Sequence, residues 1–234
     1  MRYEARTPWS PLAALIAVGT ILVGALAAGL VVADIVTRGG GVGGEATRVA
    51  VSMLAMQAIA IVAVVLASMF RGAYPSAVLS LDRWPGFGAL LVTCLGALAI
   101  LLPYNLVVYL VAPKAFAADL APFREIILSP AAALFFFVIA IGAPVSEELV
   151  FRGFLQSALT KSRLGFWGAA AVTTTLWTAM HAGYSLAGLL EVFLIGVYFA
   201  YVLWRTGSLW LPIFGHAIYN ATLFLVLRYV PLPF

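Results

Sequence analysis

The residues with the clearest chemical potential are two adjacent carboxylates, Glu147 and Glu148, followed by Arg152. On an α-helix Glu148 and Arg152 share a face, which allows an ion pair, while Glu147 is turned about 100° away. One carboxylate is then neutralised and the other stays free. A free carboxylate in an apolar site suits a general base that activates water. The alternative interpretation is an ordinary, solvated helix end.

The chain contains only two histidines, and each lies four residues from a side chain that would share its helical face. Trp177 precedes His181, and Asn220 follows His216. Two hydrogen-bonding groups inside an apolar run are costly unless they meet partners or water. A packing histidine and a polar contact between helices are the simpler alternatives for these two pairs.

The elements that carry these residues are predicted to be membrane helices. Of 234 residues, 64% are hydrophobic and 9% are charged, whereas a soluble domain has roughly 45–50% and about 25%. Charge-free gaps repeatedly reach the length of about 20 residues that a span needs. We therefore expect an all-α, polytopic transmembrane bundle of about seven helices, with six to eight as the range. The expected spans are residues 10–34, 49–70, 84–112, 128–146, 164–182, 186–204 and 208–229.

The chain is expected to form a single integral membrane domain over 1–234, with N-terminal helices in 1–130. A charge at the bilayer centre costs roughly 2.5–3.5 kcal/mol, so ionisable residues at membrane depth indicate function. They gather in roughly the last 90 residues, near or within separate spans that a bundle can bring together around a polar cavity. There Glu147 with His181 could activate a water, and His216 with Asn220 could bind an oxyanion.

Three motifs and one intervening run resemble the CAAX-processing and bacteriocin-processing (CPBP, or Abi) family of intramembrane proteases. The motifs are Glu147-Glu148-x-x-x-Arg152, Trp177-x-x-x-His181 and His216-x-x-x-Asn220, and the run is Arg205 to Ile213. The resemblance covers about residues 140–222. Any one motif is weak, but three in order with suitable gaps are specific.

The resemblance implies an all-helical membrane peptidase in which Glu147 and His181 activate water. Glu148 and Arg152 would support the site, and His216 with Asn220 would stabilise the oxyanion. Trp177 stands where the family usually has phenylalanine, which predicts a changed pocket shape with the site retained.

A zinc site is the alternative to direct catalysis by glutamate. Glu147, His181 and His216 could supply two histidines and a carboxylate with a position open for water. The His-Glu-x-x-His pair of ordinary zinc peptidases is absent from the sequence. We favour catalysis by Glu147 without a cofactor and keep zinc as the alternative.

The expected partners are the lipid bilayer and a peptide or membrane-associated protein substrate. Lys and Arg are scattered singly at the ends of apolar runs, which is typical of membrane anchors and not of nucleic-acid binding. Eight of them, including Arg152, fall on the side of the N-terminus and five on the other, which favours a cytoplasmic N-terminus in a bacterial cytoplasmic membrane. Glu191 would either face the cavity and influence substrate entry or lie near a membrane interface, and we favour the interface for it and for Asp34, which sits at a predicted span end.

Two other function classes use similar residues. An ion-coupled transporter also places Glu, His and Asn in the membrane, but it predicts broken helices in two related halves, and the sequence shows no such symmetry. A silent scaffold or immunity protein predicts the loss of one or more catalytic side chains, and all the expected positions are filled. An intramembrane endopeptidase is therefore the favoured prediction.

Overall fold

The computed structural model describes residues 3–39 and 44–231, and within these ranges the regular structure is helical, without strands. The N-terminal part contains α1 (Pro11–Arg38), α2 (Gly44–Ser68), α3 (Pro75–Val78), α4 (Phe87–Val111) and α5 (Pro113–Ile127). A composite helix, Ala132–Thr160, follows. The chain continues through α9 (Gly165–Ala179), α10 (Leu186–Thr206) and α11 (Trp210–Tyr229).

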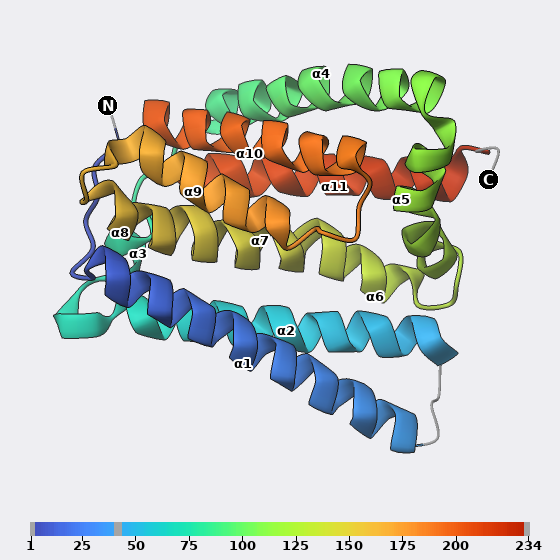
Figure 1. Ribbon diagram of the computed structural model, residues 1–234, viewed down its shortest axis with the longest axis horizontal. Coiled ribbons are helices and arrows are strands. Elements are labelled where there is room, and N and C mark those ends of the chain that lie inside the picture. Colours follow the sequence, from blue (N-terminus) through green and yellow to red (C-terminus); the bar gives the residue numbers. More distant parts are fainter. Residues whose placement is uncertain (1–2, 40–43, 232–234) are drawn as a thin grey trace.

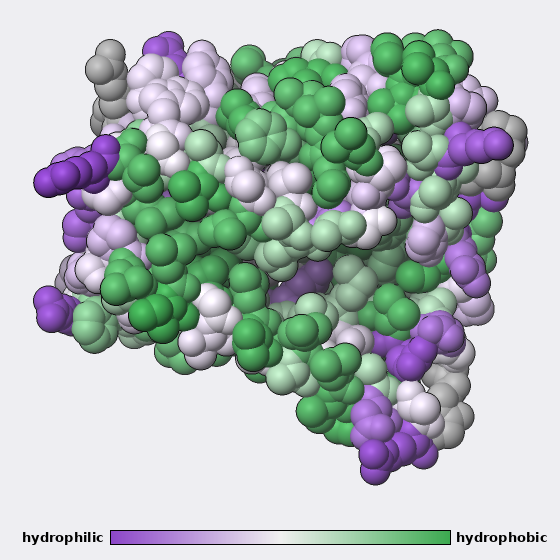
Figure 2. Space-filling view, in the orientation of Figure 1, coloured by the Kyte–Doolittle hydropathy of each residue, from purple (hydrophilic) through white to green (hydrophobic). Residues whose placement is uncertain are grey.

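Six of these helices are long and apolar enough to cross a membrane: α1, α2, α4, the composite helix, α10 and α11. They run roughly alongside one another in Figure 1, whereas α5 crosses one end of the bundle. Figure 2 shows hydrophobic surface across the middle of the molecule and hydrophilic residues toward the two ends of the helices. The arrangement is that of a polytopic helical membrane bundle, as predicted.

The composite helix is the centre of the bundle. In its most apolar window 61% of residues are buried, against 22% in α1 and α2 and 17% in α4. Figure 1 places the α1–α2 pair on one side of it and α9, α10 and α11 on the other. The helix with the greatest burial is therefore the one that carries Glu147, Glu148 and Arg152.

The prediction that this span ends at residue 146 is wrong, because helical structure continues without a break to Thr160. Its parts are α6 (Ala132–Phe137), a π-helical turn (Val138–Gly142), α7 (Ala143–Glu147), a second π-helical segment (Glu148–Leu155) and α8 (Gln156–Thr160). Glu148 and Arg152 are fully buried. The interpretation of this motif as a solvated helix end is therefore also wrong.

A proline explains the first π-helical turn. The Ala143 N–H donates to the Val138 carbonyl, which is the five-residue spacing of a π-helix. At the same spacing the next donor would be Pro144, which has no N–H. Its acceptor, the Ile139 carbonyl, instead accepts a hydrogen bond of 2.7 Å from Nδ2 of Asn220 on α11. A side chain from another helix thus replaces the missing backbone donor.

The structure differs from the prediction at two helices, α9 and α5. The expected span at 164–182 is the shorter α9, which has 15 residues and is below the length of about 20 that a full span needs. Figure 1 shows α9 ending part-way along the composite helix, and His181 follows shortly after its last residue, Ala179. Helix α5 was not predicted, because its charged residues and Pro122 break the apolar pattern.

The connection between the first two expected spans includes residues 40–43, which lie outside the described residues. Arg152 was counted among the basic residues on the side of the N-terminus, but it is fully buried. Without it the comparison becomes seven against five, so the charge bias that favours a cytoplasmic N-terminus is smaller.

The N-terminal segment is tied across one end of the bundle. Lys161 Nζ donates to the Thr7 carbonyl at 2.9 Å, and Trp9 Nε1 donates to the Ala67 carbonyl at 2.9 Å. Arg6 donates two hydrogen bonds, of 2.6 and 2.7 Å, to the two carboxylate oxygens of Asp82. This bidentate pair joins the segment to the connection between α3 and α4.

We predict that Asp82→Asn lowers the apparent melting temperature at neutral pH. Hydrogen bonding from Arg6 holds the pKa of the Asp82 carboxyl below its usual value, although partial burial acts in the opposite direction. A depressed pKa in the folded state stabilises the protein above the unfolded value of about 3.9, and this stabilisation is lost as the pH falls through the folded value. Thermal melting in detergent, measured from pH 7 down through this range, should show the melting temperatures of wild type and Asp82→Asn converging at acidic pH.

The matched control is Asp34→Asn, because Asp34 forms a more exposed ion pair with Arg38 near the end of α1. Pairs of this kind contribute about 0–1 kcal/mol, so little change is expected. Equal melting temperatures for wild type and Asp82→Asn at pH 7 would show that the Arg6–Asp82 pair does not stabilise the fold.

Candidate active site

A cavity of about 440 Å³ lies among the composite helix, α5, α10 and α11. Its lining includes the four predicted catalytic residues, Glu147, His181, His216 and Asn220, together with Trp177. Residues more than 70 positions apart in sequence thus share one cavity. Figure 2 shows a hollow near the middle of the molecule with hydrophilic surface inside it.

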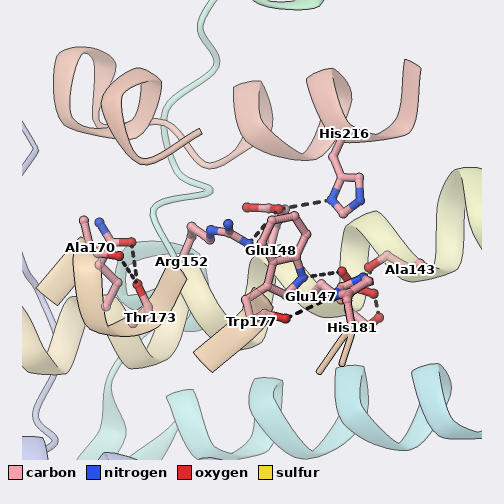
Figure 3. Close-up of polar contacts among 11 residues, drawn as sticks. Ala143, Glu147, Glu148, Arg152, Ala170, Thr173, Trp177, His181 and His216 are labelled. Carbon is pink, nitrogen blue, oxygen red and sulfur yellow. Dashed lines mark hydrogen bonds and ion pairs between the residues drawn. The ribbon is translucent and has the colours of Figure 1, made fainter. Parts of the chain in front are cut away.

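Glu147 is held by a neutral donor. Its Oε2 accepts a hydrogen bond of 2.5 Å from Nε1 of Trp177, which is buried on α9. No Lys, Arg or His in the described part of the chain lies within ion-pair distance of it. The carboxylate is therefore oriented without being neutralised by a cation (Figure 3).

The backbone orients the imidazole of His181. Its Nδ1 lies 3.0 Å from the carbonyl oxygen of Trp177, and a carbonyl can only accept. The proton of a neutral imidazole is then on Nδ1, which leaves Nε2 able to accept a hydrogen bond from water. The ring also packs edge-on against Trp177, with centroids 5.4 Å apart, as the four-residue spacing predicted.

Glu148 is the centre of a buried charge network. Its Oε1 lies 3.2 Å from Nη1 of Arg152 and 3.1 Å from Nδ1 of His216. The predicted Glu148–Arg152 ion pair is thus confirmed, and His216 is a further partner of the same oxygen (Figure 3). Arg152 also lies over the ring of Trp177, with Cζ 4.1 Å from the centroid. Trp177 therefore contacts Arg152 through its face and Glu147 through its N–H.

Gly196 allows α10 to approach this network. A Cβ atom at residue 196 would lie 2.9 Å from Nη2 of Arg152 and 3.2 Å from Cε3 of Trp177. It would also lie 2.6 Å from the Thr174 methyl carbon. Any side chain at this position would displace the arginine or the indole.

His216 and Asn220 lie on α11, as predicted, but each already has a structural partner. His216 is buried against Trp177 and Phe199, with ring centroids at 5.5 and 5.7 Å. Asn220 uses one N–H on the Ile139 carbonyl. An amide carries two N–H donors, so the second remains for a ligand in the cavity.

The interpretation of Glu191 as an interfacial residue is wrong. Glu191 lines the cavity, and its Oε1 accepts hydrogen bonds from Nδ2 of Asn105 at 2.5 Å and from the hydroxyl of Tyr219. Tyr219 lies between His216 and Asn220 in sequence, but Asn105 is on α4, which carries no family motif. A second polar cluster therefore extends the cavity wall beyond the predicted site.

Helix α5 contributes a residue that the sequence did not reveal. The carboxylate of Asp119 accepts hydrogen bonds of 2.7 Å from the Ser185 N–H and 2.6 Å from its hydroxyl. Ser185 in turn caps α10, since its Oγ accepts from the Gly188 N–H. The contact fixes α5 against the start of α10 at the cavity wall.

The predicted zinc ligands do not form a metal-binding group in the described part of the chain. There, no three His, Cys, Asp or Glu side chains are grouped closely enough to hold an ion. Nδ1 of His216 faces Glu148 and Nδ1 of His181 faces a carbonyl, which leaves Nε2 of each ring free, as it also is in histidines that bind a metal. The spacing of the three side chains is what does not fit the alternative zinc site, so the mechanism below uses no zinc.

Comparison with known proteins identifies the region that contains the site. Residues 129–222 match the family described as "Type II CAAX prenyl endopeptidase Rce1-like". All three motifs lie inside this match. The predicted resemblance is therefore confirmed over this region, which is similar to the Rce1-like CAAX endopeptidase family.

Two curated proteins are similar to the chain. The Bacillus subtilis (strain 168) protein named "Putative membrane peptidase YdiL" is 32% identical over 87 residues, which are 37% of this chain and 34% of that protein. The Escherichia coli "Uncharacterized 24.3 kDa protein" is 34% identical over 110 residues, which are 44% of this chain and 50% of that protein. The chain thus spans between a third and a half of the length of these relatives. No solved structure matches it.

We predict that Arg152→Ala lowers the free energy of unfolding by about 3–5 kcal/mol, because removing one partner of a buried pair leaves Glu148 as an uncompensated buried charge. The measurement is denaturation of the purified protein in detergent. Arg48→Ala is the control, since its pair with Glu45 is exposed. Equal stabilities for wild type and Arg152→Ala would contradict the buried network.

A separate prediction concerns Asn220→Ala, which leaves the Ile139 carbonyl with neither Pro144 nor Asn220 as a donor. The expected loss is about 1–3 kcal/mol of stability. Thr222→Ala is the control on the same helix, because Thr222 donates only to its own backbone at an exposed position. Unchanged stability in Asn220→Ala would show that its amide does not support the π-helical turn.

Proposed function

We propose that the chain is an intramembrane endopeptidase that hydrolyses a peptide bond in a peptide or membrane-associated protein, with water activated by Glu147 and His181. One observation carries this proposal. A carboxylate without a cationic partner lines the same cavity as the only two histidines of the chain. The match of residues 129–222 to a family of CAAX prenyl endopeptidases supports the same reaction class.

The first step assigned to the site is attack by water. The Trp177 N–H fixes Glu147, and the Trp177 carbonyl fixes His181, so one residue orients both groups. A water between them would donate one proton toward Glu147 and another hydrogen bond toward Nε2 of His181. Its oxygen then forms a bond to the carbonyl carbon of the substrate, and the water proton moves to Glu147.

The second step is the collapse of the tetrahedral intermediate. The negative oxygen would accept hydrogen bonds from an Nε2–H of His216 and from the second N–H of Asn220. As the carbonyl re-forms, the C–N bond breaks and the proton held by Glu147 passes to the leaving nitrogen. The products are a carboxylic acid and an amine, so atoms and protons balance.

The rest of the cavity suggests an apolar substrate segment. Aromatic and aliphatic side chains form much of its lining, among them Phe116, Phe123, Leu223 and Phe224. Such a wall suits an apolar side chain or lipid-modified residue placed next to the scissile bond. We place the enzyme in a bacterial cytoplasmic membrane with the N-terminus in the cytoplasm, in line with the smaller excess of basic residues on that side.

We expect Glu147→Ala and His181→Ala each to abolish cleavage of a fluorogenic peptide library while the purified proteins remain folded in detergent. Wild type and Glu147→Ala are assayed with and without a zinc chelator. Activity that survives the chelator in wild type and is absent from Glu147→Ala supports direct catalysis by glutamate.

The other outcomes are equally informative. Wild-type activity that is lost with the chelator and restored by added zinc would replace the cofactor-free mechanism by a metal-dependent one. Normal turnover in Glu147→Ala would refute the assignment of the base. Inactivity of the folded wild-type protein toward every peptide would favour the carrier or scaffold alternatives.

A further inference from the structure

Gln57 is a buried polar residue on α2, outside the region that matches the peptidase family. Its Nε2 donates a hydrogen bond of 3.2 Å to the carbonyl of Val138, which is 81 residues away in sequence. Val138 begins the π-helical turn that precedes α7 and Glu147. This contact therefore joins the N-terminal helix pair to the helix that carries the candidate base.

The π-helical turn is supported from two directions. The Val138 carbonyl accepts from both the Ala143 N–H and Gln57, and the Ile139 carbonyl accepts from Asn220. The two donor side chains come from α2 and α11, which are different neighbours of the composite helix. Because Pro144 cannot complete the backbone ladder, these side chains supply hydrogen bonds at the irregular turn.

Gly142 provides the space for Gln57. A Cβ atom at residue 142 would lie 2.0 Å from Oε1 of Gln57 and 2.9 Å from its Cδ. The amide of Gln57 thus packs directly against a glycine at the end of the turn. Its Oε1 is buried and has no hydrogen-bond partner among the described residues, so this position of the side chain carries a desolvation cost.

We propose that Gln57 is a positioning residue: it fixes the π-helical turn and thereby the direction in which Glu147 enters the cavity. Converting a π-helical turn to an α-helical one changes the register by one residue, and each residue corresponds to a rotation of about 100°. Glu147 follows the turn by five residues, so its carboxylate would leave Nε1 of Trp177. The effect on rate rests on the proposed function, whereas the effect on geometry does not.

The geometric test uses fluorine NMR of protein labelled with 5-fluorotryptophan. The chain has six tryptophans, and the Trp177 signal is assigned as the one missing from Trp177→Phe. Gln57→Met keeps the length of the side chain but removes the donor. We expect it to shift or split the Trp177 signal, as Glu147→Ala does, while the other five signals change little.

Ser52→Ala is the matched control on α2. Ser52 donates to the Gly29 carbonyl at 2.8 Å between α1 and α2, and among the described residues it makes no hydrogen bond to the composite helix. It should leave the Trp177 signal in place. The proposal would be overturned if Glu147→Ala moves the Trp177 signal but folded Gln57→Met leaves it in place.

Gly142→Ala is a second variant that keeps the Gln57 side chain but excludes it from its position. It should produce the same Trp177 shift as Gln57→Met, and Gln57→Ala combined with Gly142→Ala should be no worse than Gly142→Ala alone. Additive effects of the two changes on the Trp177 signal and on the melting temperature would contradict the coupling.

The kinetic test follows cleavage of a fluorogenic peptide. Gln57→Met is expected to lower kcat by about 10²-fold, as a misplaced catalytic group does, with little change in KM. A rise in KM at constant kcat would show that Gln57 shapes substrate binding instead and would overturn the positioning role. If wild type cleaves no peptide, the proposed function fails, and the NMR comparison still decides the role of Gln57.

Discussion

The fold around the site depends on the neutralisation of one buried carboxylate, Glu148. Isolated in an apolar bundle, this charge would be very costly, and Arg152 and His216 offset the cost by approaching the same oxygen. The ion pair fixes the position of the Arg152 guanidinium, and the guanidinium packs against the face of the Trp177 ring and so fixes the position of that ring. Trp177 then orients Glu147 through its N–H. The structural carboxylate Glu148 is therefore linked through three contacts to Glu147, the proposed base.

The composite helix carries both carboxylates, and its irregularity links the two halves of the chain. Pro144 and the π-helical turn before it leave backbone acceptors that α2 and α11 satisfy with Gln57 and Asn220. If the composite helix were a regular α-helix, the direction of the Glu147 side chain would follow from the backbone geometry of that helix alone. Here its direction also depends on the N-terminal helix pair, which carries none of the family motifs. Helices outside the family match can thus contribute to the geometry of the candidate site.

The sequence predicted the bundle and the ion pair because both follow from short-range patterns. Long apolar runs predict spans, and a four-residue spacing brings Glu148 to Arg152 and Trp177 to His181. It could not predict that Glu148 also meets His216, since that contact depends on helix packing. Glu191 was misplaced for the same reason: its partners lie on two other helices. The end of the composite helix was missed because buried, paired charges resemble exposed ones in a sequence.

The central claim is a division of labour between adjacent carboxylates, and one comparison tests it most directly. Glu147→Gln and Glu148→Gln are measured side by side for kcat and for thermal stability, since glutamine keeps the size of the side chain and removes only the charge. We expect Glu147→Gln to be as stable as wild type and inactive. We expect Glu148→Gln to melt at a lower temperature, because Arg152 is left without a counter-charge. An active Glu147→Gln, or a Glu148→Gln protein with unchanged stability, would contradict this account.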